Sequence, residues 1–170
     1  MTDRLRVLHL IPNLAGGGAE RQCCLLSASQ CQAGVDVHVA LLAGGPYLQL
    51  LERSGARMHW LGAFGNHDPL LIPRLLLLIR SLRPDVIQTW IRHMDVFGGV
   101  AALLSGTPWV LTERASAPHY SDSLKNPLRA RLGRCAPAIV SNSMTGDGCW
   151  AGLGGAPHRR FGVSDRGASD

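Results

Sequence analysis

Three consecutive glycines, Gly16, Gly17 and Gly18, stand between an apolar segment and a helical segment that begins at Ala19. Glycine loses more conformational freedom on folding than any other residue, so three in a row indicate backbone passing where side chains cannot. Peptide N–H groups at such a turn, followed by a helix N-terminus, bind an anion or a sugar hydroxyl. The alternative is a tight turn that binds nothing. We predict that these glycines bind substrate.

Two known phosphate-binding motifs do not account for this turn. A Walker loop needs a lysine and a serine or threonine after its last glycine, whereas Ala19 and Glu20 stand there. The dinucleotide fingerprint G-x-G-x-x-G fits Gly16 and Gly18 but has Arg21 in place of its third glycine. Asp36 lies at about the distance expected for a ribose-binding acid, yet the missing glycine argues against this motif. Arg21 is a candidate for contacting an anion.

Two further pairs of polar residues follow apolar segments. His93 and Asp95 come after "DVIQTW", and a histidine beside a carboxylate can hold a sugar hydroxyl or transfer a proton. They are the candidate catalytic residues, although Asp95 can equally be a helix N-cap. Glu113 is the last residue of "PWVLTE" and Arg114 follows it, and both are candidates for binding substrate. Their alternative role is an ion pair between loops, which contributes little when exposed.

The elements that position these residues alternate along the chain. We predict strands at 5–11, 35–43, 56–62, 85–90, 108–113 and 137–143, and helices at 19–33, 47–55, 69–82, 94–106 and 125–134. This alternation predicts an α/β fold with a doubly wound, Rossmann-like, mostly parallel sheet and helices on both faces. Ligands of such sheets bind beyond the carboxyl ends of the strands, where every candidate residue lies. Gly98 and Gly99 would let the helix at 94–106 pack closely on the sheet.

Composition excludes several functional classes. Hydrophobic residues make up 46% of the 170 residues, the net charge is +5, and Lys125 is the only lysine. Aromatic residues make up 5% and no nucleic-acid-binding module occurs, so we expect no nucleic-acid partner. The five cysteines include no Cys-x-x-Cys pair, so we expect no metal site, no disulfides and a reducing cytosol. The apolar segment around Arg74 and Arg80 is too short and too charged to span a bilayer.

Three segments together carry a family resemblance. They are "RVLHLIPNLAGGGAERQ", "PDVIQTWIRHMDVFGGVAALLSGTPWVLTERAS" and "AIVSNS". In this order and spacing they cover roughly residues 4–163, and they resemble the amino-terminal domain of the retaining GT-B glycosyltransferases of family four. The resemblance implies one half of a GT-B architecture, which binds the acceptor and faces a second domain. That second domain binds the nucleotide-sugar, which is a co-substrate, so no tightly bound cofactor is expected.

The chain departs from the family pattern at its end. The Glu-x7-Glu motif of the donor-binding domain is absent, because the only glutamates are Glu20, Glu52 and Glu113. We therefore expect a domain at 1–163, a disordered or non-native tail at 164–170, and a truncation or frame change near Val163. The carboxy-terminal donor domain would be a missing partner, and the chain alone would be inactive.

The resemblance also suggests a biological role. The full-length enzyme would transfer a sugar from a nucleotide-sugar to a glycan or lipid-linked acceptor, in polysaccharide or cell-envelope synthesis. We expect a cytoplasmic location at the inner face of the membrane, with peripheral contact through two basic, apolar helices. The arginines of these helices are Arg74, Arg80, Arg83, Arg129, Arg131 and Arg134. The alternative function is a stand-alone nucleotide- or sugar-binding module without catalysis.

Overall fold

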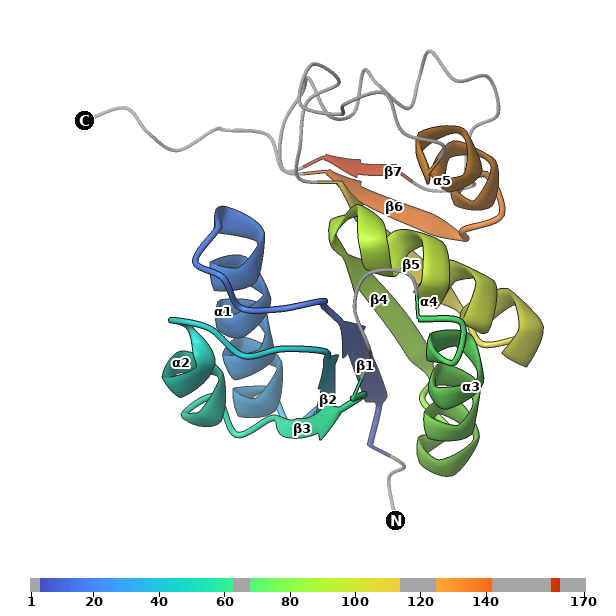
Figure 1. Ribbon diagram of the computed structural model, residues 1–170. Helices are drawn as coiled ribbons and strands as arrows, with labels where there is room; N and C mark the ends of the chain where they lie inside the picture. Colours follow the sequence, from blue (N-terminus) through green and yellow to red (C-terminus); the bar gives the residue numbers. More distant parts are fainter. Residues whose placement is uncertain (1–3, 63–67, 114–124, 142–159, 163–170) are drawn as a thin grey trace.

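The computed structural model describes residues 4–62, 68–113, 125–141 and 160–162 (Figure 1). The strands are β1 (Arg6–Leu10), β2 (Asp36–Leu41), β3 (Arg57–Trp60), β4 (Val86–Trp90), β5 (Trp109–Glu113), β6 (Ala138–Ser141) and β7 (Arg160–Gly162). The helices are α1 (Gly18–Gln32), α2 (Leu48–Glu52), α3 (Leu71–Leu82), α4 (Ile91–Ser105) and α5 (Lys125–Gly133).

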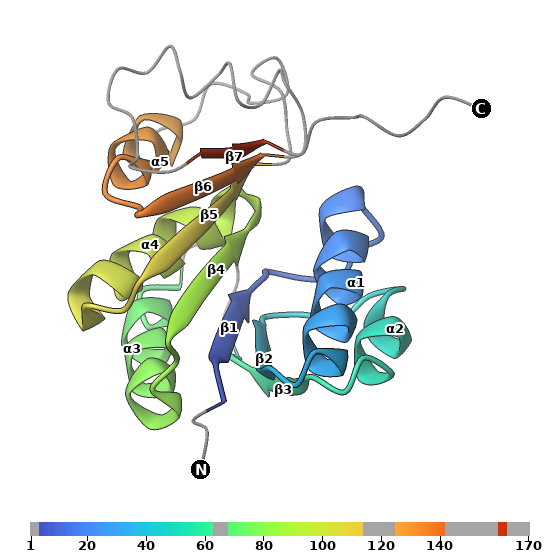
Figure 2. The same cartoon turned by 180° about the vertical axis from the view of Figure 1, so that it is seen from behind.

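The strands form one sheet in the order β3-β2-β1-β4-β5-β6-β7, and every pairing in it is parallel. From β1 the chain winds outward through α1 and α2, and α3 then returns it to β4, beside β1. Helices α1 and α2 therefore cover one face, whereas α3, α4 and α5 cover the other (Figures 1 and 2). This confirms the predicted doubly wound fold, with its topological switch between β1 and β4.

Two details differ from the sequence-based prediction. Helix α4 starts at Ile91, directly after β4 and three residues before the predicted start, so His93 lies in the first helical turn. Strand β7 was not predicted and extends the sheet beyond β6. Its three residues show no alternation of polar and apolar side chains, so only the neighbouring strand identifies it as a strand. The predicted tail at 164–170 lies outside the described residues.

The core has one apolar layer on each face of the sheet. Cys23, Cys24 and Leu51 pack beneath α1 and α2, and Leu75 and Met94 pack beneath α3 and α4. Strands buried on both faces read as nearly continuous apolar runs, which is why the central strands could be predicted from sequence. Cys23 and Cys24 are not in a disulfide and act as small core residues.

The two glycines inside α4 allow the helix to approach the sheet, as predicted. A Cβ at Gly99 would lie 2.6 Å from the Trp109 ring, and a Cβ at Gly98 would lie 2.6 Å from Leu10. The Trp109 side chain is 1% exposed, and its indole N–H donates to the Thr89 hydroxyl at 2.9 Å. The ring therefore cannot move aside at low cost.

We expect Gly99→Val to lower the free energy of unfolding by about 2 kcal/mol, because the new side chain would overpack the contact with Trp109. The matched control is Gly18→Val, since a Cβ at Gly18 would meet nothing within 4 Å. Urea denaturation of both variants measures the difference. Equal midpoints for Gly99→Val and the wild type would contradict the close packing of α4.

Candidate functional site

The glycine turn lies at the carboxyl end of the central strand β1. Gly16 has a φ of 109°, which favours glycine over any other residue, and Gly17 is the N-cap of α1. Gly16, Gly17 and Gly18 are all exposed, and Gly18 has open space around it. Among the described residues nothing lies within 4 Å of the Cβ position of Gly18, so a ligand can reach the backbone there.

A second glycine loop supports this turn from the side of β2. The Leu42 N–H donates to the Pro12 carbonyl at 3.0 Å, and the Leu14 N–H donates to the Gly44 carbonyl at 3.3 Å. A Cβ at Gly45 would overlap the Leu14 carbonyl, so only glycine permits this approach. The loops after β1 and β2 thus continue the pairing of their strands, which fixes the position of the glycine turn.

The Glu20 side chain changes the chemistry expected of the turn. Its carboxylate lies against Gly17, at the N-terminal end of α1, where negative charge is favourable. Glu20 is 8% exposed, and within the described part of the chain its side chain has no hydrogen bond or ion pair. A carboxylate here repels a phosphate but accepts hydrogen bonds from hydroxyls. Of the two ligands left open by the sequence, the sugar hydroxyl is therefore favoured. Arg21 is exposed and points away from the core.

The start of α4 borders the same region from the neighbouring strand β4. Ile91 has a φ of 69°, a conformation that costs a β-branched residue about 1–3 kcal/mol. This residue turns the chain from strand to helix without a loop. His93 follows in the first turn, half-buried, with its ring 4.8 Å from the Phe97 ring. The candidate histidine is thus held on a helix at the carboxyl end of β4.

Trp90, at the end of β4, belongs to the core. It is fully buried, and its indole N–H donates to His9 Nδ1 at 3.1 Å. His9 Nε2 therefore carries the proton and donates to Gln30 Oε1 at 2.7 Å. Burial lowers the pKa of His9 from 6.5 to about 4. The neutral ring joins β1, β4 and α1 beneath the glycine turn.

Asp95 and Glu113 lie inside the protein and share one arginine. Arg129 Nε donates to Asp95 Oδ2 at 2.6 Å, and Arg129 Nη1 donates to Glu113 Oε2 at 2.8 Å. The other Asp95 oxygen accepts from the Thr89 hydroxyl at 2.7 Å. Both carboxylates are 0% exposed, and burial raises the pKa of Asp95 although Arg129 and Thr89 oppose the shift. These contacts join α4, β5 and α5, and they place both carboxylates away from solvent.

The structure excludes the ribose-binding role considered for Asp36. Asp36 is the first residue of β2, at the amino end of the sheet, whereas ligands of this fold bind at the carboxyl ends. Its carboxylate accepts from Arg6 Nε at 2.7 Å, and this contact lowers the pKa of Asp36. Arg114, the remaining candidate, lies outside the described residues.

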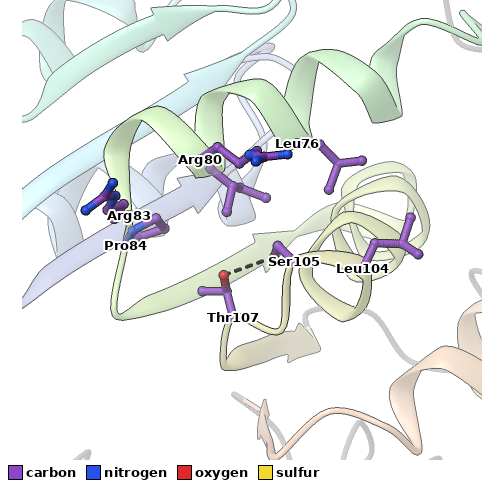
Figure 3. A pocket seen from close by; sticks show the side chains of 8 residues that line it. Leu76, Arg80, Arg83, Pro84, Leu104, Ser105 and Thr107 are labelled. Carbon is purple, nitrogen blue, oxygen red and sulfur yellow. Dashed lines mark hydrogen bonds between the residues drawn. The ribbon is translucent and has the colours of Figure 1, made fainter.

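A separate groove lies between α3 and α4, at the amino end of the sheet (Figure 3). It has a volume of about 580 Å³ and contains none of the candidate residues. Its lining residues are Leu76, Ile79, Arg80, Arg83, Pro84, Leu104, Ser105 and Thr107.

Of the six helix arginines expected to form a basic surface, Arg129 is instead buried, and Arg74 pairs with Asp68 at 2.9 Å. In the described ranges, no helix has both the length and the apolar character needed to cross a membrane.

Comparison with known proteins decides the family. The model of Glycosyltransferase Family 4 matches residues 16–146, which include the glycine turn, β4, α4 and β6. The chain belongs to glycosyltransferase family 4. No curated protein sequence gives a significant match.

Solved structures extend the comparison to the fold of this family-4 domain. HepE from Anabaena, determined with UDP and glucose, matches with a TM-score of 0.75 and 19% identity, over 94% of this chain and 44% of HepE. MurG of Acinetobacter baumannii matches with a TM-score of 0.62 and 19% identity, over 83% and 42% of the two chains. WaaB, a lipopolysaccharide outer core galactosyltransferase, matches with a TM-score of 0.67 and 10% identity, over 92% and 44%. The family-4 domain thus has the fold of one half of a GT-B protein, and it spans less than half the length of these proteins.

The structure gathers only some of the candidates at the carboxyl edge of the sheet. The glycine turn and the start of α4, with His93, follow neighbouring strands. Asp95 and Glu113 follow β4 and β5 but face Arg129 instead of solvent. The sequence analysis did not select Glu20 as a site residue, because its burial against Gly17 is visible only in the structure.

We expect Arg129→Met to lower the free energy of unfolding by about 3–5 kcal/mol, because two buried carboxylates would lose their shared cation. The control is Arg131→Met, which removes an exposed arginine from the same helix and should change stability by less than about 0.5 kcal/mol. Thermal and urea unfolding compare the two variants. Similar small effects from both would contradict the buried network.

We expect His9 to make the protein less stable in acid. Its folded-state pKa of about 4 lies below the unfolded value of 6.5, so the unfolded chain binds the proton first as pH falls between these values. The resulting loss is about 3 kcal/mol by pH 4. In His9→Gln this contribution disappears, so its unfolding free energy should fall less steeply over the same range. Parallel curves for the two proteins would argue against a buried neutral His9.

Proposed function

We propose that this chain is the acceptor-binding half of a glycosyltransferase that transfers a sugar from a nucleotide-sugar to a glycan or lipid-linked acceptor. The observation that carries the proposal is the open glycine turn at the switch point of a family-4 domain. The turn offers the peptide N–H of Gly18, and the carboxylate of Glu20 lies against the adjacent Gly17. A hydroxyl group can accept a hydrogen bond from the first and donate one to the second.

The donor site belongs to the part of the enzyme that this chain does not match. The chain spans 44% of HepE, whose structure holds UDP and glucose. We propose that a nucleotide-sugar is the co-substrate, bound mainly by a second domain opposite the glycine turn. Because a retaining transfer of this kind needs no protein nucleophile from this half, the role of these residues is to position the acceptor. His93 is the side chain we assign to contact the reacting hydroxyl.

The acceptor class sets the proposed cellular location. WaaB is named for transfer to the lipopolysaccharide outer core, which agrees with a role for this chain in polysaccharide or cell-envelope synthesis. We infer a cytoplasmic protein that works at the inner face of the membrane. Peripheral contact would use the exposed Leu77 and Leu104 with Arg80 and Arg83, which supply both apolar and basic side chains on α3 and α4.

We expect the chain alone to transfer no labelled glucose from UDP-glucose to lipid-linked saccharides, whereas a hybrid restores transfer. The hybrid joins residues 1–162 to the part of HepE outside the structural match. Gly18→Val in the hybrid should lower the rate about tenfold or more, because the side chain covers the amide that positions the acceptor. Thin-layer separation of labelled product measures the transfer.

The control for this hybrid is Leu5→Ala, which removes an exposed apolar side chain just before β1, at the amino end of the sheet, and should leave the rate unchanged. Turnover by the chain alone would overturn its assignment as half of an enzyme. An inactive hybrid that still binds saccharide would instead favour the stand-alone binding module.

A further inference from the structure

An exposed tryptophan lies at the carboxyl edge of the sheet, away from the residues discussed so far. Trp60 is the last residue of β3 and is 54% exposed. Within the described residues its indole has no hydrogen bond and no aromatic neighbour. Large aromatic side chains are usually buried because each covers considerable apolar area, so such exposure at a ligand-binding edge calls for an explanation.

Contacts along this edge connect Trp60 with the glycine turn. The Trp60 ring lies 3.6 Å from the Cβ position of Gly44, in the loop after β2. In the same loop, Pro46 Cγ lies 3.9 Å from the Cβ position of Gly16. Gly45 and Pro46, between these two contacts, are exposed. Gly45 and Pro46 thus lie between the glycine turn and Trp60, and we call the set Gly18, Glu20, Gly45, Pro46 and Trp60 the β1–β3 shelf.

Both ends of the β1–β3 shelf lie on the same face of the sheet. Trp60 pairs in register with Leu41, whose side chain packs in the layer beneath α1 and α2. Residues paired in a parallel sheet point to the same face, so Trp60 points to the side where α1 carries Glu20. Strand β3 is two strand spacings from β1, roughly 10 Å, which is about the length of a disaccharide.

We propose that the β1–β3 shelf is a subsite for an uncharged saccharide portion of the acceptor, with a sugar ring stacked on Trp60 and a second unit hydrogen-bonded at Gly18 and Glu20. This inference rests on the proposed function and adds the position and chemical class of the bound group. The apolar face of a pyranose ring packs on an aromatic plane, and its hydroxyls remain free to bond at the rim.

The charges on the shelf select against an anionic ligand. Glu20 is more than nine-tenths buried, lacks a partner among the described residues and lies directly against the turn. A phosphate or a uronic acid placed at Gly18 would meet this carboxylate, whereas a neutral sugar would donate hydroxyl hydrogens to it. Glu20 therefore serves as an acceptor for ligand hydroxyls, and Trp60 supplies the apolar contact.

The test is titration of the full chain with neutral disaccharides (maltose, cellobiose, lactose and chitobiose) and, separately, with glucuronic acid and inorganic phosphate. Ligand-observed NMR measures the dissociation constants. For the disaccharide that binds best, we expect Trp60→Ala to weaken binding about tenfold and Trp60→Phe to weaken it less. Glu20→Gln should weaken binding severalfold and reduce the preference for neutral ligands.

Matched controls are Glu52→Gln, an exposed glutamate on α2, and Leu104→Ala, an exposed apolar residue outside the shelf. Both should bind as the wild type does, and circular dichroism verifies the folding of every variant. If Trp60→Ala and Glu20→Gln leave disaccharide binding unchanged, the subsite is wrong, but the proposed function still stands. A wild-type chain that binds no saccharide would overturn both. If analytical ultracentrifugation shows a wild-type dimer that Trp60→Ala dissociates, and saccharide binding is unaffected, Trp60 is an interface residue and the subsite is wrong.

Discussion

The parallel pairing of β1 with β4 is the constraint on which the other features depend. These strands are far apart in sequence, and the pairing runs from Val7 with Val86 to Leu10 with Thr89. Because the chain winds away from this pair in both directions, the connection after β1 passes over one face and the connection after β4 over the other. None of the crossovers that the structure describes covers the carboxyl ends of the pair. The glycine turn and the first turn of α4 therefore become neighbours there.

Buried polar contacts stabilise the protein directly beneath this edge. His9 connects β1 with Trp90 and Gln30, and Arg129 connects α5 with carboxylates on α4 and β5. A buried charge or ring nitrogen is tolerated only when it is hydrogen-bonded, so each of these groups fixes the relative position of the elements it joins. The edge where we propose that ligand binds is thus held by directional contacts in addition to apolar packing.

Sequence reasoning succeeded where the signal was local. Apolar runs identified the inner strands, and the positions of Gly98 and Gly99 predicted the close approach of α4. It failed where a partner distant in sequence decides the role of a side chain. Asp95 was a catalytic candidate and Glu113 a substrate-binding candidate, but Arg129, 34 and 16 residues away, joins both in a buried structural network. For Asp36 the sequence already argued against a ribose-binding role because the third glycine is missing, and the position of Asp36 at the start of β2 gives an independent reason.

The backbone at Ile91 has a consequence for how this protein can change. A residue with a branched side chain holds a left-handed conformation that glycine or asparagine would adopt freely. Laboratory selection for heat resistance alone should therefore replace this isoleucine early. Selection for sugar transfer would instead preserve the direction in which α4 leaves the sheet, because a more flexible residue at position 91 would allow that direction to vary. Comparing the residues that the two selections retain at position 91 would show whether the left-handed backbone there serves sugar transfer.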